Sequence, residues 1–173
     1  MAEVERPPPR VGLGRWVLFA VVMFMASAIT ASLMLQVRPS TDPCDLKRVP
    51  LILDGCDLTR EQAALSTTDL RGAFLRGATL DGINLDNRDL RGAHLEGASL
   101  RAVSLSGAKL TGSWLSGVDL TGGTLTRACL RASRLEWADL TDVKLDGADL
   151  TGADLVGAQG VKGLLPKPGP GCG

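Results

Sequence analysis

Residues 148–157 read ADLTGADLVG, which is two copies of a single five-residue unit. The same period extends far upstream, because leucine occupies every fifth position from Leu65 to Leu155, nineteen times without a break. A helix face repeats about every 3.6 residues and a strand face about every two, so neither produces this period. The chain must therefore return an apolar side chain to its interior once in every five residues.

The other positions of the unit are also restricted. The residue two before each leucine is usually small, the residue just before it is mostly polar, and glycine is commonest two residues after it. Leucine and the small residue are expected to point inward, while glycine permits a tight turn. Stacked coils pair their backbone groups at strand spacing, so the pattern predicts a solenoid.

Units such as ADLTG at residues 148–152 and ADLVG at residues 153–157 resemble the A(D/N)LxX motif of pentapeptide repeat proteins. The resemblance covers about residues 64–160. It implies an all-β fold, a right-handed, four-sided (quadrilateral) parallel β-helix with four pentads per coil. Nineteen pentads then make nearly five coils.

The chain divides into five segments. Residues 1–15 are expected to be a disordered N-terminal tail, and residues 16–37 a transmembrane helix. Residues 38–63 are expected to be a linker and N-terminal cap. The β-helix is assigned to residues 64–160, and a C-terminal cap with a flexible tail to residues 161–173.

The apolar segment has more than one interpretation. Residues 16–35 contain no charge and are long enough to cross a bilayer, which favours an uncleaved anchor. A signal peptide cleaved near Ala28 is the alternative, and a buried core helix is a third reading. Basic residues on the two sides of the segment nearly balance, with a lean toward the N-terminus in the cytoplasm. The protein is therefore placed at a membrane as a single-pass chain, with the β-helix on the non-cytoplasmic side or exported after cleavage.

Four cysteines bear on the compartment. Cys44 and Cys56 bracket a short segment before the repeats and are a candidate disulfide, which suits an oxidising compartment. Cys129 and Cys172 are a weaker candidate pair. Four unrelated thiols remain an alternative. The cysteines contain no CxxC pair, so a metal site is not expected.

Two places break the pattern. Leu58 lies seven residues before Leu65, and Thr59 and Gln62 have capping-box spacing, which predicts a short helix or an irregular cap. Arg88 occupies an inward position that is normally small. An unpaired guanidinium is costly in an apolar interior. Either the backbone bulges and turns Arg88 outward, or Asp86 or Asp89 pairs with it; a tolerated defect is the simpler view.

With four pentads per coil, residues twenty apart lie on one face. The position before leucine then aligns aromatic residues on a single face, with Trp137 at its edge. This candidate interaction face contains Phe74, His94, Trp114, Arg134 and Trp137. Outward aromatic residues anchor interfaces efficiently, although an accidental alignment explains the column equally well.

These features favour a non-enzymatic, membrane-tethered scaffold or protein-interaction module. Its expected partners are an unknown protein and the lipid bilayer; no cofactor, metal, nucleic acid or small-molecule substrate is expected. The resemblance also implies an alternative, a DNA mimic that binds topoisomerases. Lys and Arg total 19, as do Asp and Glu, so the chain is neutral and a poor imitation of a phosphate backbone. An enzyme is disfavoured because a leucine-filled rod has no pocket.

Overall fold

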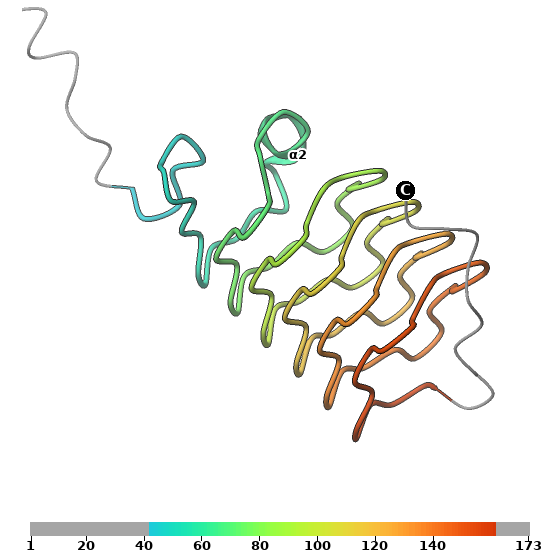
Figure 1. The fold of residues 1–173 in the computed structure, drawn as a ribbon. Coiled ribbons are helices and arrows are strands. Elements are labelled where there is room, and N and C mark those ends of the chain that lie inside the picture. Colours follow the sequence, from blue (N-terminus) through green and yellow to red (C-terminus); the bar gives the residue numbers. More distant parts are fainter. Residues whose placement is uncertain (1–41, 162–173) are drawn as a thin grey trace, which may run out of the picture. The chain divides into compact units, whose positions relative to one another are not determined.

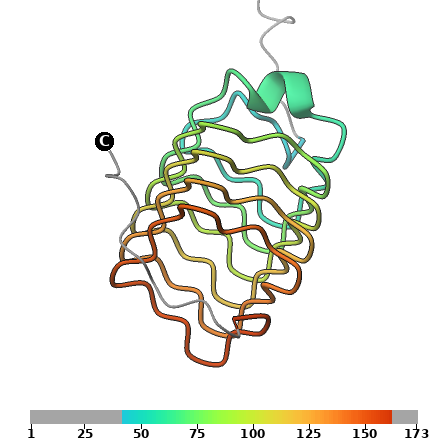
Figure 2. The ribbon, with the colours of Figure 1, turned by 90° about the vertical axis from the view of Figure 1, so that its right-hand side faces the viewer.

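The computed structural model describes residues 42–161, which form a stack of coils in sequence order (Figure 1). Parallel single-residue bridges join each coil to the next. From Phe74 onward the bridged residues are twenty apart, as in Phe74 with His94 and His94 with Trp114. Four pentads per coil are therefore confirmed, and the coils lie one above another (Figure 2).

The interior of the stack is a continuous column of leucine. No leucine of the repeat between Leu70 and Leu140 is more than 2% exposed, and most of the small residues two before them are equally buried. Burying one leucine contributes about 1.5–3 kcal/mol. This burial, together with the bonds between coils, holds a chain that has almost no regular helix or extended strand in the described range.

A tight turn follows each leucine of the repeat from Leu70 to Leu155. The leucine carbonyl accepts a bond from the amide three residues on, as in Ala73 N to Leu70 O at 3.2 Å. The third residue of the turn has a positive φ, which glycine adopts without steric cost, as in Gly72 with φ 60°. Non-glycine residues adopt the same conformation at six turns, with φ between 51° and 60°: Asn87, Ala102, Arg127, Ala132, Trp137 and Asp142.

The β-helix was expected from the sequence to start at residue 64, but it begins upstream of that residue. Ile52 bridges Phe74 and Asp57 bridges Thr79, so the first coil comprises residues 52–73 and its stride is 22. Leu53 and Leu58 are fully buried within it. Leu58 is therefore part of the core, and the two extra residues of its seven-residue spacing to Leu65 are absorbed inside the first coil.

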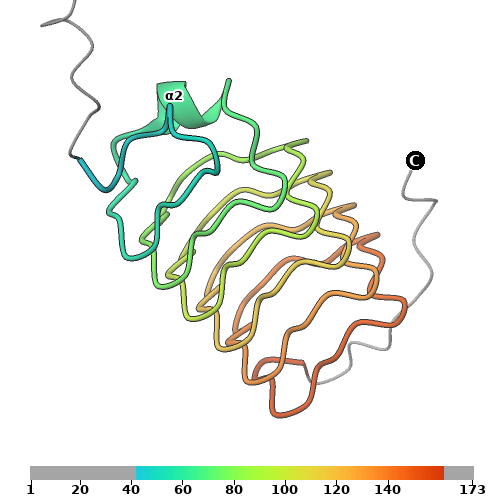
Figure 3. The ribbon, with the colours of Figure 1, turned by 60° about the vertical axis from the view of Figure 1, so that its left-hand side comes forward.

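The short helix α2, Gln62–Leu65, accommodates the extra residues and lies at the first coil in Figure 3. A helix here was expected, but the capping box is wrong. Glu61 is the N-cap and makes no side-chain cap bond, while the Thr59 hydroxyl donates to Asp57 Oδ1 at 2.7 Å. The helix instead interrupts the backbone hydrogen bonding between the first coil and the next.

Side chains replace the missing backbone partners of the first coil. The Gln62 amide accepts from Asn84 N at 2.7 Å and donates from Nε2 to Asn84 O at 2.8 Å. These are the two bonds that a backbone peptide makes in a parallel bridge. Gln62 therefore continues the ladder through its side chain, and its role is pairing between coils.

Arg88 performs a similar task on the neighbouring side. Nη1 donates to Ser66 O at 2.7 Å, and Nη2 donates to Thr68 O. The backbone of Arg88 is regular, since its carbonyl accepts from Lys109 N at 2.8 Å. The expected bulge and the expected Asp86 or Asp89 partner are both wrong: the guanidinium binds carbonyls of the preceding coil that α2 and the segment after it leave without a backbone donor.

A disulfide between Cys44 and Cys56 closes the N-terminal end, with the two Cα atoms 5.7 Å apart, as the sequence suggested. Cys44, Leu46 and Leu51 pack against the core there. Cys129 is also disulfide-bonded. Cys172, its suggested partner, lies outside the described residues, as does most of the expected C-terminal segment 161–173.

The membrane segment expected at residues 16–37 and the tail expected at residues 1–15 also lie outside the described range. Within residues 42–161, no helix is long and apolar enough to cross a membrane.

Candidate interaction face

The expected aromatic column exists as one row of bridged residues. Phe74, His94, Trp114 and Arg134 follow one another in successive coils, and Ile52 precedes them in the first coil. We define the aromatic face as Phe74, His94, Trp114 and Arg134, with Trp137 at its edge. The twenty-residue stride places these side chains beside one another because each extends from the same position of its coil.

The rings form one continuous stack. The centroids of Phe74 and His94 are 4.8 Å apart with the planes inclined by 7°, and those of His94 and Trp114 are 5.3 Å apart at 24°. A guanidinium closes the stack at Trp114, where Arg134 Cζ lies 3.8 Å from the ring centroid. At the other end Arg76 Cζ lies 5.4 Å from the centroid of Phe74.

In this stack the faces of the rings contact one another. Neighbouring coils are separated by about 4.8 Å, which places rings of successive coils close to stacking distance. Phe74, His94 and Trp114 are half-buried. The stack is part of the fold as well as part of the surface, a double role that the sequence did not reveal.

His94 also has a polar contact on this face. Its Nδ1 lies 3.3 Å from Glu96 Oε1, and both side chains are about one quarter exposed. The second carboxylate oxygen of Glu96 is buried without a hydrogen-bond partner, one of only two such side-chain atoms in the described residues. The other is Nε of Arg88.

Trp137 is the most exposed aromatic residue of this face, with 71% of its surface accessible. It has a φ of 60° at a position where glycine is usual, and its ring covers Gly157, where a Cβ atom would collide with it. Val156, 65% exposed, accepts a backbone bond from Trp137 N at 2.9 Å. Trp137 and Val156 therefore form an apolar edge at the C-terminal side of the face.

Aspartates on the other faces have a local structural role. At Asp57, Asp139 and Asp149 the carboxylate accepts from both the amide and the hydroxyl of the threonine two residues later. These bonds lower the pKa of all three carboxyl groups, with the threonine hydroxyl as the largest cause. The frequent DLT pattern thus caps the turn after the leucine.

Ion pairs form between residues just before and just after the leucine on the side of the coil that contains Leu70 and Leu90. Arg71 pairs with Asp69, Arg91 with Asp89, and Arg131 with Asp149 at 2.6 Å. The hydrogen bond from Arg71 holds the pKa of Asp69 at about 2. Within residues 42–161, no group of three His, Cys, Asp or Glu side chains is placed to hold a metal ion.

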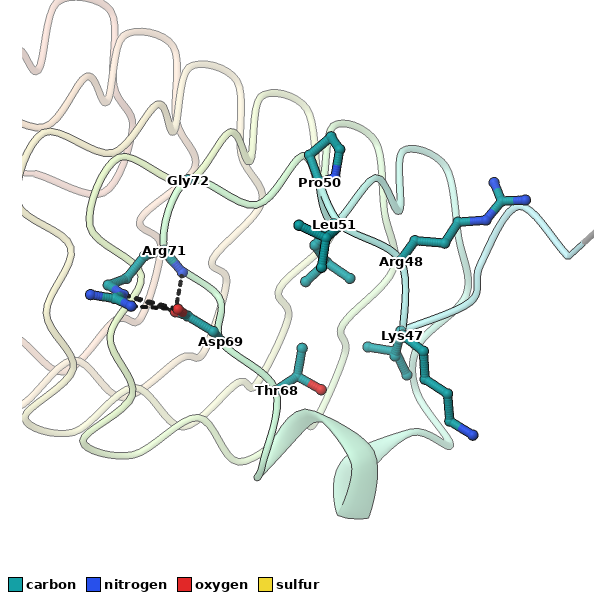
Figure 4. Close-up of a pocket in the computed structure, with 10 residues that line it drawn as sticks. Lys47, Arg48, Pro50, Leu51, Thr68, Asp69, Arg71 and Gly72 are labelled. Atoms are coloured by element: carbon teal, nitrogen blue, oxygen red, sulfur yellow. Dashed lines mark hydrogen bonds and ion pairs between the residues drawn. The ribbon is translucent and has the colours of Figure 1, made fainter. Parts of the chain in front are cut away.

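A shallow hollow of about 350 Å³ lies at the N-terminal end, beneath the loop formed by residues 47–50 (Figure 4). Leu46 and Leu51 line its apolar part, and the Asp69–Arg71 pair lines the side opposite the loop. Lys47 and Arg48 point away from that pair. This hollow was not expected, because the linker had no recognisable periodicity.

Comparisons with known proteins find repeats similar to those of this chain. The family model of pentapeptide repeats matches residues 83–122 and 124–157 in eight copies. No curated protein matches the chain. Among solved structures, pentapeptide repeat proteins from the cyanobacteria Cyanothece 51142 (Rfr23) and Nostoc PCC 7120 (alr5209) are 36% and 38% identical, with TM-scores of 0.48 and 0.40. The matches cover 49% and 46% of this chain, and 57% and 62% of those chains.

A third similar structure is a pentapeptide repeat protein from the thylakoid lumen of Arabidopsis thaliana. It is 32% identical, with a TM-score of 0.33, over 53% of this chain and 63% of that chain. This chain therefore spans less than two thirds of the length of each of these three relatives.

Proposed function

Because the repeats of this chain are pentapeptide repeats arranged as a β-helix, we propose that the protein is a non-enzymatic interaction module tethered to a membrane through residues 16–37. The aromatic face contacts a partner protein, and the β-helix lies on the non-cytoplasmic side. The tether and the partner rest on the apolar segment of the sequence and on the properties of this face.

The observation that carries the proposal is the position of the exposed apolar side chains. Four large hydrophobic residues of the described range are exposed, and three of them belong to the aromatic face or its borders: Ile52, Trp137 and Val156. Together with the stacked rings they form an apolar band from the first coil to the last. Interface cores are enriched in aromatic residues and arginine, which this band supplies.

The stack is also suited to binding because it is already ordered. Phe74, His94 and Trp114 hold one another in place, so a partner loses little of the free energy of binding to ordering their side chains. The Arg134 guanidinium over Trp114 is fixed in the same way. Trp137 packs on Gly157 while most of its surface stays accessible, so it is a preformed anchor.

The disulfide supports the proposed location. A bridge between Cys44 and Cys56 is typical of oxidising compartments, and the β-helix enters such a compartment if the N-terminus stays in the cytoplasm. The neutral balance of charges is consistent with a protein partner, since it provides no general attraction for nucleic acid.

The test is affinity purification of the full chain from detergent-solubilised membranes, comparing the parent with two variants. Trp137→Ala combined with Val156→Ser removes the exposed edge and leaves the stacked rings unchanged. The control is Thr124→Ala combined with Lys144→Ala on the opposite face. We expect the edge variant to lose a partner that the parent and the control retain. Equal recovery of every protein by all three would refute the docking role of this face.

A second variant separates binding from stability. Replacing Phe74, Trp114 and Trp137 together removes every aromatic residue of the aromatic face except His94, and the partner should be lost. The stacked pairs contribute about 0.5–1.5 kcal/mol each beyond burial, so this variant should also melt at a lower temperature than the edge variant. Partner loss is therefore interpreted only from protein whose circular dichroism matches the parent. Sequencing the N-terminus of the purified chain distinguishes an intact anchor from cleavage near Ala28.

A further inference from the structure

The C-terminal end of the described β-helix differs from the earlier coils in charge. Residues 135–161 contain six acidic side chains and one basic side chain, whereas residues 42–134 contain eleven acidic and twelve basic side chains. The acidic residues of this end are Glu136, Asp139, Asp142, Asp146, Asp149 and Asp154, and the basic residue is Lys144. The neutral balance of the whole chain therefore conceals an acidic end, which attracts cationic groups.

The exposed indole of Trp137 presents one open face at this acidic end. A Cβ atom on Gly157 would lie 2.5–2.7 Å from Cε3, Cδ2 and Cζ3, three consecutive atoms of the ring. Distances this similar mean that the face of the ring, and not its edge, covers the glycine. Trp137 is nevertheless 71% exposed, and no atom lies within 4 Å of the place where a Cβ would stand on Gly117, one coil earlier. One face of the indole thus packs on the backbone, and the other is accessible to a partner.

Two other rings of the aromatic face are already covered by an arginine. Arg134 Cζ lies 3.8 Å from the centroid of Trp114, and Arg76 Cζ lies 5.4 Å from the centroid of Phe74. Within residues 42–161, no cationic side chain lies over the ring of Trp137. The face therefore shows how an arginine stacks on its rings, and it leaves its most exposed ring without one.

A carboxylate stands beside the open ring. Asp154 Oδ1 accepts from Val156 N at 3.0 Å, so this carboxylate caps the turn whose glycine, Gly157, lies under the ring of Trp137. Asp154 is exposed, and Arg134, its bridge partner in the preceding coil, extends toward an earlier coil and forms no ion pair with it. An aromatic face beside an exposed carboxylate suits a guanidinium, which stacks through its plane and donates through its edge.

We propose that this edge of the aromatic face binds an arginine side chain of the partner protein, an inference that rests on the docking role in the proposed function. The guanidinium stacks on the open face of the Trp137 indole and donates to the Asp154 carboxylate. Val156 contacts the aliphatic part of the same side chain. The other carboxylates of residues 135–161 favour a partner whose contacting surface is basic. Arginine fits this site better than lysine, because a planar guanidinium can stack and donate at once.

The test uses short peptides of defined sequence and the full chain in detergent. A fluorescein-labelled peptide of alternating glycine and arginine is compared with two matched peptides, in which citrulline or lysine replaces arginine. Citrulline keeps the shape of arginine without its charge. Fluorescence anisotropy measures the affinity of each peptide. We expect the arginine peptide to bind about tenfold more tightly than the citrulline peptide, with the lysine peptide between them.

Two variants assign the affinity to this edge. Trp137→Gly introduces the residue that is commonest at this turn position, so it removes the ring without straining the backbone, and the affinity for the arginine peptide should decrease about tenfold. Asp154→Asn keeps an acceptor for Val156 N but removes the charge, and it should weaken binding about threefold. Asp57→Asn, a turn cap in the first coil, is the matched control and should bind as the parent does.

Three results would overturn the proposal. Equal affinity of the parent for the arginine peptide and for either matched peptide would mean that the site does not recognise a guanidinium. An affinity that Trp137→Gly leaves unchanged would mean that the acidic end attracts the peptide without this site. Failure of the parent to bind any of the peptides, which is expected if residues 162–173 or a second copy of the chain cover Trp137, would exclude a partner's arginine there.

The peptide assay and the affinity purification separate the two proposals. If the edge variant, Trp137→Ala with Val156→Ser, loses a partner but the parent binds arginine and citrulline peptides equally, the docking role stands and the recognition of arginine is wrong. If the edge variant retains every partner, the docking role is wrong, and the assignment of this site to a partner's arginine is lost with it.

Discussion

The first coil and the later coils solve the same problem with different groups. From Phe74 onward, backbone amides and carbonyls join each coil to the next at a stride of twenty. In the first coil α2 interrupts this backbone pairing on two sides, and the side chains of Gln62 and Arg88 take its place. The difference shows that a solenoid tolerates an irregular coil when side chains can supply the missing hydrogen bonds.

The largest expected effect comes from the regular coils. Leu100 is fully buried in the middle of the leucine column. Leu100→Ala should lower the free energy of unfolding by about 2–5 kcal/mol, because it removes buried surface and leaves a cavity. Urea unfolding followed by circular dichroism measures this, with Leu155→Ala as a half-buried comparison expected to cost less. Equal losses at both positions would show that the described end of the stack is as well packed as its middle.

Arg88 should have the next largest effect, because it joins the two regions. Arg88→Ala leaves the carbonyls of Ser66 and Thr68 without this donor, and we expect a loss of roughly 1–3 kcal/mol. Arg88→Lys retains a charge but cannot reproduce both bonds, so it should lie between the parent and Arg88→Ala. A melting temperature of Arg88→Ala equal to that of the parent would make the residue a tolerated defect.

Gln62 tests whether a side-chain amide replaces a peptide. Gln62→Glu keeps the acceptor for Asn84 N but loses the donor to Asn84 O, and we expect a loss of about 1 kcal/mol. The effect should be confined to the first coil, so hydrogen exchange should accelerate at Asn84 and not at Thr124 on the same face. Uniform acceleration along the stack would mean that the coils unfold together.

Ala102→Gly should stabilise the later coils slightly. Ala102 has a φ of 52° at the glycine position of its turn, which costs an L-residue roughly 1–2 kcal/mol, partly offset by the greater freedom of glycine in the unfolded chain. We expect a net gain of about 0.5–1 kcal/mol, measured by thermal melting. Ala98→Gly, at an inward position where φ is not positive, is the control and should destabilise the protein.

The smallest expected effect is that of one turn cap on acid stability. Thr141 donates to the Asp139 carboxylate and lowers its pKa below the ordinary value near 4. The ionised carboxylate therefore stabilises the folded state above that ordinary value, and the contribution is lost as the pH decreases through the lowered pKa. The melting temperature of Thr141→Val should be lower than that of the parent at pH 7, and the difference between the two should be smaller at pH 3. A difference in melting temperature that does not change with pH would mean that the loss of stability comes from the hydroxyl alone.

Much of the fold was predictable because it is periodic. The leucine spacing predicts a solenoid, and the resemblance to pentapeptide repeat proteins implies four pentads per coil, a stride that aligns Phe74, His94 and Trp114. The start of the β-helix was misplaced because two extra residues after Leu58 shift the phase without removing the coil. The partners of Arg88 were missed because they are carbonyls, which carry no signature in the sequence.

The sequence by itself determined which side chains of the regular repeats point inward, because a strict period assigns each of them a position, and the resemblance to pentapeptide repeat proteins implied which of them share a face. The tertiary structure alone decided what those side chains contact. Ring stacking between Phe74, His94 and Trp114, the replacement of backbone pairing by Gln62 and Arg88, and the packing of Trp137 on Gly157 all depend on residues about twenty positions apart or on the path of an irregular segment. Contacts of this kind form only when the coils stack, because each contact joins side chains or backbone groups from two neighbouring coils.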